Sequence, residues 1–224
     1  MTEVAHILQL VAKDLQIEAR SRQTIGLIVV LGVLIVVVLG LGLGAGGPVE
    51  GMRATAILWV AYLFGGVLCF EKTMAVEAHD GALAGLMLAP VDRGSIYLGK
   101  LLANLALMLA MALVVTPVGV VMFRFDLSVA PAGFIVVMAL SMIGFAAVGT
   151  LFAAAVTSSR LQGGLLAVLV FPLCLPLVIA STQQMLGMFE EGRALAGPGL
   201  GLLIAFDIIF IAASWLVFEA LLEP

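Results

Sequence analysis

Long uncharged stretches, each about the length of a membrane crossing, dominate the pattern of polar and apolar positions along this chain. A helix needs about 20 apolar residues to cross a bilayer. The charged residues leave room for six such helices, near residues 25–45, 54–70, 101–123, 132–156, 164–184 and 200–221. The expected fold is all-α, and we expect a single transmembrane domain over residues 1–224.

The residues before the first crossing predict a helix that lies along the membrane surface. Val4, Ile7, Leu8, Val11 and Leu15 recur at helical spacing, with polar residues on the opposite face. The segment is too polar to cross the bilayer, so we interpret it as an amphipathic interfacial helix. The alternative is a short cap that packs on the other helices.

The polar segment between the second and third crossings has the clearest internal order. Asp80 can cap a short helix, on which Leu83, Leu86 and Met87 form one apolar stripe. Such a stripe packs on its own bundle or docks into the groove of a partner. The pattern alone leaves both alternatives open.

The end of this segment predicts a second helix and argues against nucleotide binding. Pro90 ends the short helix, and Asp92 can cap a helix that continues into the third crossing. Residues 94–100 resemble a phosphate-binding P-loop, but Leu101 stands where that motif needs a hydroxyl, and no strand precedes it. We therefore expect no nucleotide binding by this chain, and if ATP drives the protein, another subunit must hydrolyse it.

Composition supports the membrane assignment and gives an orientation. The chain is 63% hydrophobic and 11% charged, and its net charge of −4 offers no basis for nucleic-acid binding. One predicted side carries seven basic residues and the other three, which places both termini in the cytoplasm. The seven are Lys13, Arg20, Arg22, Lys72, Arg93, Lys100 and Arg160, and the three are Arg53, Arg124 and Arg193.

Three features inside or between the crossings have both structural and functional interpretations. Asp207 lies in the sixth crossing, where a carboxylate couples protons, contacts a substrate or bonds to a neighbour such as Asn104. We favour the hydrogen bond, because no second intramembrane charge forms a relay. Pro172 and Pro176 predict a kink or local break, which is a gate or a fixed bend. Residues 186–198 could add a short outer helix.

The chain shows no grouping of residues that indicates catalysis or a bound cofactor. His6 and His79 have no partner at metal-ligand spacing, and Cys69 and Cys174 lie in apolar stretches, where they are expected to fill space. No nucleophile and base are paired in a recognisable pattern. We expect no enzyme activity, no metal and no cofactor held by this chain.

Several motifs resemble those of the CcmB family, the membrane permeases of cytochrome c maturation. The central loop carries the most specific of them, and the weaker ones run from the N-terminal helix to the last crossing. An acidic residue expected in the family is replaced by Ala84. The loop matches are Glu77, Asp80-Gly81-Ala-Leu83, Leu86-Met-Leu-Ala-Pro-Val-Asp-Arg93 and Tyr97-Leu-Gly-Lys100.

The resemblance implies a partner-dependent role in haem handling. Proteins of this family are six-helix permeases within an ABC-type complex of bacterial inner membranes. They pair with the ATPase CcmA and work with CcmC and the small CcmD to deliver haem to the periplasmic chaperone CcmE. The family is named for haem export, and a competing view has ATP hydrolysis release haem-loaded CcmE. The working unit is expected to hold two such chains, or one chain with other membrane proteins.

We therefore expect the helix around Asp80–Leu88 to be a coupling helix that receives force from the ATPase. Its apolar stripe would sit in a groove of that partner, with charged residues at the rim. Two other functions stay open, an ABC-2-type exporter of lipid or drug and a non-transporting membrane scaffold. The residues assigned to coupling are Glu77, Asp80, Gly81, Leu83, Leu86, Met87, Pro90, Asp92, Arg93 and Lys100.

Overall fold

The computed structural model describes residues 3–44, 51–79, 92–124, 126–158 and 164–221, and these contain helices and turns but no strand. Six of its helices are long and apolar enough to cross a membrane, which confirms the predicted all-α multi-pass fold. That the chain forms one domain stays a prediction. The helices are α1 (Glu3–Ser21), α2 (Gln23–Gly44), α3 (Gly51–His79), α5 (Arg93–Phe123), α6 (Pro131–Ser158), α7 (Leu165–Phe189) and α8 (Pro198–Leu221), with a 3₁₀ turn η1 (Leu127–Val129).

The helix of the third crossing begins before its apolar run, at the cap that the sequence predicts. Helix α5 starts at Arg93, because Asp92 caps it and accepts a hydrogen bond from the backbone N–H of Ser95 at 3.2 Å. The predicted cap is thus confirmed, and so is the helix expected to run from it into the third crossing. The first two turns of α5 contain Lys100, which the fold buries.

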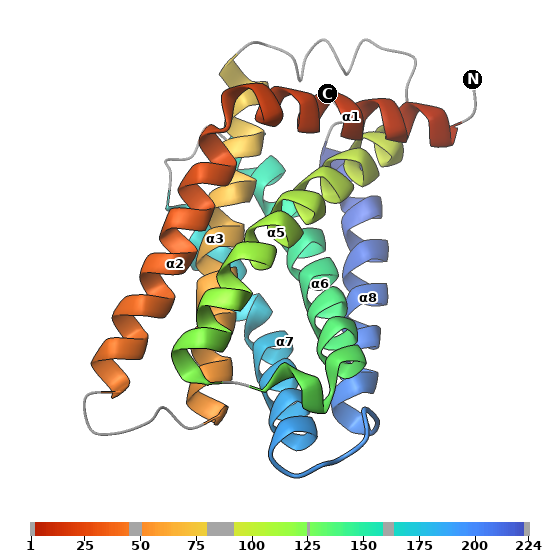
Figure 1. Cartoon of the computed structure of the whole chain (residues 1–224). Coiled ribbons are helices and arrows are strands. Elements are labelled where there is room, and N and C mark those ends of the chain that lie inside the picture. The colour runs from red at the N-terminus through yellow and green to blue at the C-terminus, as the bar shows by residue number, and fades with distance from the viewer. Residues whose placement is uncertain (1–2, 45–50, 80–91, 125, 159–163, 222–224) are drawn as a thin grey trace.

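Helix α1 lies across one end of the bundle, roughly at right angles to the spans (Figure 1). The six spans run up and down beneath it, so α1 and the end of α8 are at the same end of the bundle. Helix α5 passes obliquely across the front of the view, while α2 and α8 stand at opposite edges. This placement agrees with the predicted interfacial helix.

The bundle is held together by close aromatic packing. Trp59 of α3 makes edge-to-face contacts with Tyr62 and with Phe145 of α6. The Tyr62 hydroxyl lies 2.7 Å from Thr116 Oγ1 of α5, which links a third helix to this cluster. The cluster therefore fixes how α3, α5 and α6 pack against one another.

Helix α7 is continuous through Pro172 and Pro176, so the local break suggested by the sequence is not formed. Both prolines are exposed on the surface of the bundle, whereas Cys174 and Leu177 of the same stretch are buried in the core. Neighbouring helices that pack on this buried face hold the chain helical where two backbone donors are missing. The short helix predicted within residues 186–198 was also wrong. Helix α7 itself extends to Phe189, and residues 190–197 form turns without helix.

Candidate functional site

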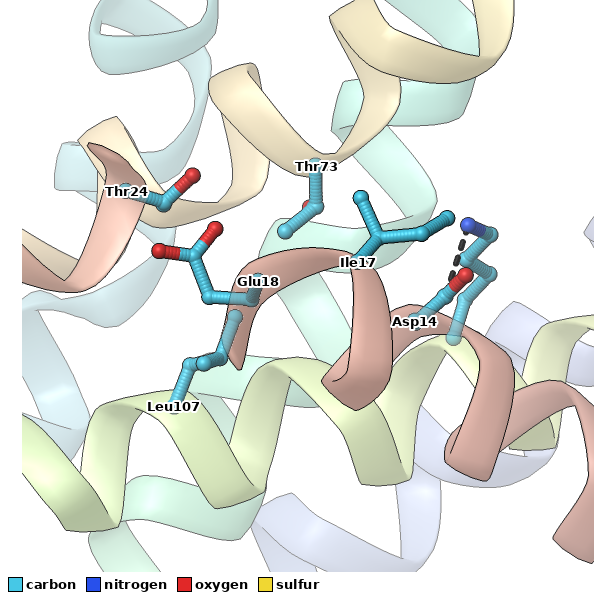
Figure 2. Close-up of a pocket in the computed structure, with 7 residues that line it drawn as sticks. Asp14, Ile17, Glu18, Thr24, Thr73 and Leu107 are labelled. Atoms are coloured by element: carbon cyan, nitrogen blue, oxygen red, sulfur yellow. Dashed lines mark ion pairs between the residues drawn. The ribbon is translucent and has the colours of Figure 1, made fainter. Parts of the chain in front are cut away.

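Helix α1 is fastened to the start of α5 by one close backbone approach and one buried ion pair. Gly99 of α5 lies against α1, and a Cβ at that position would be 2.9 Å from Leu10 Cβ. One turn further along α1, Asp14 Oδ2 lies 2.7 Å from Lys100 Nζ (dashed line in Figure 2). Lys100 is only 3% exposed, so its charge is compensated inside the protein.

The elbow between α1 and α2 is set by Glu18. This side chain is 8% exposed, and its Oε1 accepts a hydrogen bond from the backbone N–H of Ile25 at 2.7 Å. The carboxylate thus occupies the amino end of α2, where the helix dipole favours a negative charge. Arg22 closes α1 with a left-handed backbone (φ 53°), and its N–H donates to the Glu18 carbonyl at 2.7 Å.

A small cavity separates these charged groups (Figure 2). Its volume is about 30 Å³, which suits a single water molecule bonded to the surrounding polar groups. Polar and apolar side chains from four helices surround it. The lining residues are Asp14, Ile17, Glu18, Thr24, Thr73, Lys100 and Leu107.

The polar contacts continue from this cavity into the bundle through Thr73. Its hydroxyl donates to Asn104 Oδ1 at 2.8 Å, and Asn104 Nδ2 donates to Thr150 Oγ1 at 2.9 Å. Asn104 is fully buried, so these bonds satisfy a side chain that would otherwise be costly. We call Asp14, Glu18, Thr73, Lys100, Asn104 and Thr150 the polar junction, and it joins α1, α2, α3, α5 and α6.

The structure describes only part of the predicted coupling segment. Lys100 belongs to the polar junction, and Asp92 caps α5. Arg93 is the first residue of α5, and Glu77 lies near the end of α3, although its side chain is outside the described set. The remaining predicted residues, Asp80, Gly81, Leu83, Leu86, Met87 and Pro90, lie outside the described residues.

Lys100, the last of the residues assigned to coupling, lies inside the protein. It is buried within α5 and paired with Asp14. The P-loop-like residues 94–100 form the first two turns of α5, not a phosphate-cradling loop. Gly94 there packs on the indole of Trp215 in α8. These seven residues therefore serve helix packing in the structure.

Asp207 lies between α6, α7 and α8 without the hydrogen bond that we favoured. It is 6% exposed, and neither carboxylate oxygen has a hydrogen-bond partner among the described residues. A Cβ on Gly144 would be 2.7 Å from Asp207 Oδ1 and 2.4 Å from Leu177 Cδ1, so the carboxylate packs against α6. Asn104, the predicted partner, is bonded to Thr73 and Thr150 instead.

Serine and tyrosine hydroxyls join the remaining helices. Ser141 of α6 and Ser181 of α7 lie 2.5 Å apart, Oγ to Oγ. The carbonyl of Ala147 accepts from Tyr97 of α5 at 3.3 Å and from Ser214 of α8 at 3.4 Å. Sequence reasoning missed these contacts, because single hydroxyls in apolar helices do not indicate which neighbour they face.

Sequence reasoning also missed the acidic residues of α1, although the sequence carried a signal. Asp14 stands seven residues after Ile7, and Glu18 stands seven after Val11, so both acids share a helical face with the apolar stripe. An acid on an apolar face needs a buried partner. Lys100 and the amino end of α2 supply those partners.

No group of three or more His, Cys, Asp or Glu side chains that could hold a metal occurs within the described ranges. Cys69 and Cys174 are buried and free, in agreement with their predicted packing role. Within the same ranges, the polar junction brings together no nucleophile and base. What it offers is a set of buried polar links between helices.

A family model described as "CcmB protein" matches residues 5–223, which is nearly the whole chain. No curated protein matches the chain.

Proposed function

Since this chain belongs to the CcmB family, a family of haem-export ABC permeases in cytochrome c biogenesis, we propose that it couples ATP hydrolysis by a partner to haem delivery. The match over residues 5–223 is the observation that carries this proposal. The structure has six candidate spans and, among the described residues, no large domain outside them. This composition fits a membrane subunit that depends on a separate ATPase.

The proposed contact with the ATPase is the segment between α3 and α5. Its described neighbours, the end of α3 and the start of α5, both lie at the end of the bundle that carries α1 (Figure 1). The segment contains Leu83, Leu86 and Met87, whose spacing would give a short helix an apolar stripe for a partner's groove. Glu77, Asp80 and the α5 terminus would supply rim contacts.

The polar junction connects the proposed ATPase contact with the helices of the bundle. The first twelve residues of α5 contain both Lys100, which pairs with α1, and Asn104, which bonds to α3 and α6. A displacement applied at Asp92 therefore acts on α1, α3 and α6 through α5. Packed helices joined by discrete polar contacts move as rigid units from one arrangement to another. Such movement would carry a conformational change of the ATPase into the membrane helices.

We place the α1 end of the bundle in the cytoplasm of a bacterial cell, at the inner membrane. Seven of the chain's ten basic residues fall on the side predicted to hold both termini, and this asymmetry supports that orientation. An ATPase needs cytoplasmic ATP, so the proposed contact segment is on the required side. The haem chaperone, a CcmE-like protein, would be on the opposite side.

The proposed complex also contains CcmA-like, CcmC-like and CcmD-like proteins. Haem is then the handled ligand, and this chain itself holds no resident cofactor. Its two histidines, His6 in α1 and His79 at the end of α3, belong to polar segments of the sequence. A plausible pair of histidine ligands is missing from the sequence, which favours release of the loaded chaperone over haem passage.

Purification from native membranes tests the proposal. The tagged chain, expressed in place of its own gene product, is isolated in mild detergent, and the co-purifying proteins are identified by mass spectrometry. An ABC ATPase and haem-handling membrane proteins are expected, together with loss of c-type cytochromes when the chain is deleted. Isolation with a lipid- or drug-export system, and normal cytochromes in the deletion strain, would contradict it.

A further inference from the structure

A groove about ten times larger than the small cavity lies at the elbow between α1 and α2. Its volume is about 330 Å³, within the range of small-molecule sites, about 300–1,000 Å³. It shares Glu18 and Leu107 with the small cavity, and its other lining residues come from α1, α2 and α5. They are Leu15, Ala19, Arg22, Ile25 and Ala110.

The floor of this elbow groove is apolar and continues into the lipid-facing surface. Leu15, Ile25, Leu107 and Ala110 supply the floor from three helices. One turn beyond Ala110 on the same face of α5, Leu113 is 76% exposed. A hydrocarbon chain in the groove can thus continue along α5 into the bilayer without meeting a polar group of that face.

The rim of the groove carries an exposed cation, Arg22. Its side chain has no ion pair or hydrogen bond within the described part of the chain. Its left-handed backbone (φ 53°) favours Gly or Asn, so an arginine at this position costs backbone free energy. A contact made by the guanidinium would offset that cost.

We propose that the elbow groove binds one bilayer phospholipid, with its phosphate on Arg22 and an acyl chain along the apolar floor. Helix α1 lies across the ends of the spans, which is the depth of lipid phosphates (Figure 1). The floor of the groove is formed in part by residues of spans α2 and α5. An arginine fork matches the paired oxygens of a phosphate.

Glu18 also faces the groove, but it does not compete with the phosphate at the rim. It is 8% exposed, and its Oε1 is engaged by the N–H of Ile25. The lipid headgroup therefore meets Arg22 first. A chain bound beneath the elbow would fill the space between α1 and α5 and hold α1 on the membrane surface.

Native mass spectrometry of the purified protein, with the proteins that accompany it, tests this site. After delipidation the protein is titrated with phosphatidylglycerol, and the affinity of the tightest-bound lipid is measured. Arg22→Gly is expected to weaken that affinity about tenfold, because one charge-assisted contact is lost. Thermal stability should be kept or raised, since Gly suits the left-handed turn.

Two further variants separate this site from general attraction of lipid to positive charge. Arg20→Gln removes another exposed cation of α1 that does not line the groove, and it should leave the affinity unchanged. Ala110→Phe fills the floor without changing charge, and it should weaken binding as Arg22→Gly does. Equal lipid affinity in the unmodified protein, Arg22→Gly and Ala110→Phe would overturn the proposal, and so would a crosslink from residue 22 to another protein in place of lipid.

Discussion

At the scale of single residues, Asn104 and Asp207 show opposite outcomes for a polar side chain inside an apolar bundle. Asn104 is fully buried and bonded to hydroxyls on two other helices. Asp207 is nearly as buried and has no bonded partner among the described residues. The first therefore stabilises helix association, while the second costs stability and is the stronger candidate for a function.

We expect Asn104→Leu to destabilise the protein by about 1–3 kcal/mol, since the buried Thr150 hydroxyl loses its amide donor and the Thr73 hydroxyl loses an acceptor. Thermal unfolding in a fixed detergent measures the change. Thr73 has a second acceptor, the Phe70 carbonyl, so Thr73→Val should cost less than Asn104→Leu. An Asn104→Leu protein as stable as the unmodified one would show that these bonds do not hold the helices.

We expect Asp207→Leu to stabilise the protein by about 1–3 kcal/mol. The buried carboxyl has no hydrogen-bond partner among the described residues, and leucine is an apolar side chain of similar size. The same unfolding assay measures it. A loss of stability would reveal a partner for the carboxylate.

Function is assayed separately with Asp207→Asn, which keeps the shape of the side chain. If Asp207 couples protons, this variant should lose cytochrome c maturation while its unfolding temperature is retained. Full maturation would remove the proton-coupling role.

At the scale of elements, the apolar pattern predicted the number of spans because each crossing needs a long uncharged run. It did not predict that Lys100, at the edge of the third run, is buried, because the Asp14 carboxylate that pairs with it comes from a distant helix. The cap at Asp92 was predictable from local chemistry. The cluster of Trp59, Tyr62 and Phe145 was not, because it depends on how helices pack.

The candidate site was predictable only in part, for the same reason. Asn104 and Lys100 stood out as polar residues near apolar runs, but their partners come from helices 31 to 86 positions away in sequence. Thr73 and Thr150 look unremarkable in sequence. Whether Pro172 would kink α7 or break it was left open by the sequence, because the outcome depends on how the buried face of that helix packs.

The ion pair between α1 and α5 yields a prediction with an internal control. Asp14→Lys and Lys100→Asp should each destabilise the protein by about 3–5 kcal/mol, since each replaces a buried ion pair by two like charges. The double exchange, Asp14→Lys with Lys100→Asp, should recover much of that loss. A double-mutant cycle of unfolding free energies measures the coupling. Strictly additive effects would mean that the pair does not join the helices.

The crossing of α3 and α6 depends on a glycine. A Cβ on Gly149 would be 2.0 Å from Phe70 Cε2, so Gly149→Ala is expected to destabilise the bundle by about 1–3 kcal/mol through overpacking. Adding Phe70→Leu removes the obstructing ring and should restore part of the stability. Gly26→Ala is a matched control, because a Cβ there meets nothing within 4 Å.

At the scale of the whole molecule, the structure consists of six spans with one helix lying across an end, and α5 links the two through its first turns (Figure 1). The proposed segment for the ATPase lies directly before α5 in sequence. A single helix thus connects the proposed motor contact with the polar junction and the aromatic cluster. This arrangement favours a permease in which the ATPase displaces α5 and, through it, the helices that α5 contacts.

Co-purification of an ABC ATPase with Leu86→Asp tests the central claim most directly. Val129→Asp is the control, because Val129 is a similarly apolar residue, 56% exposed, in η1 at the other end of the bundle. We predict that Leu86→Asp yields folded protein without bound ATPase and without stimulated ATP hydrolysis, whereas Val129→Asp retains both. Undiminished ATPase binding and stimulation in Leu86→Asp would contradict the account.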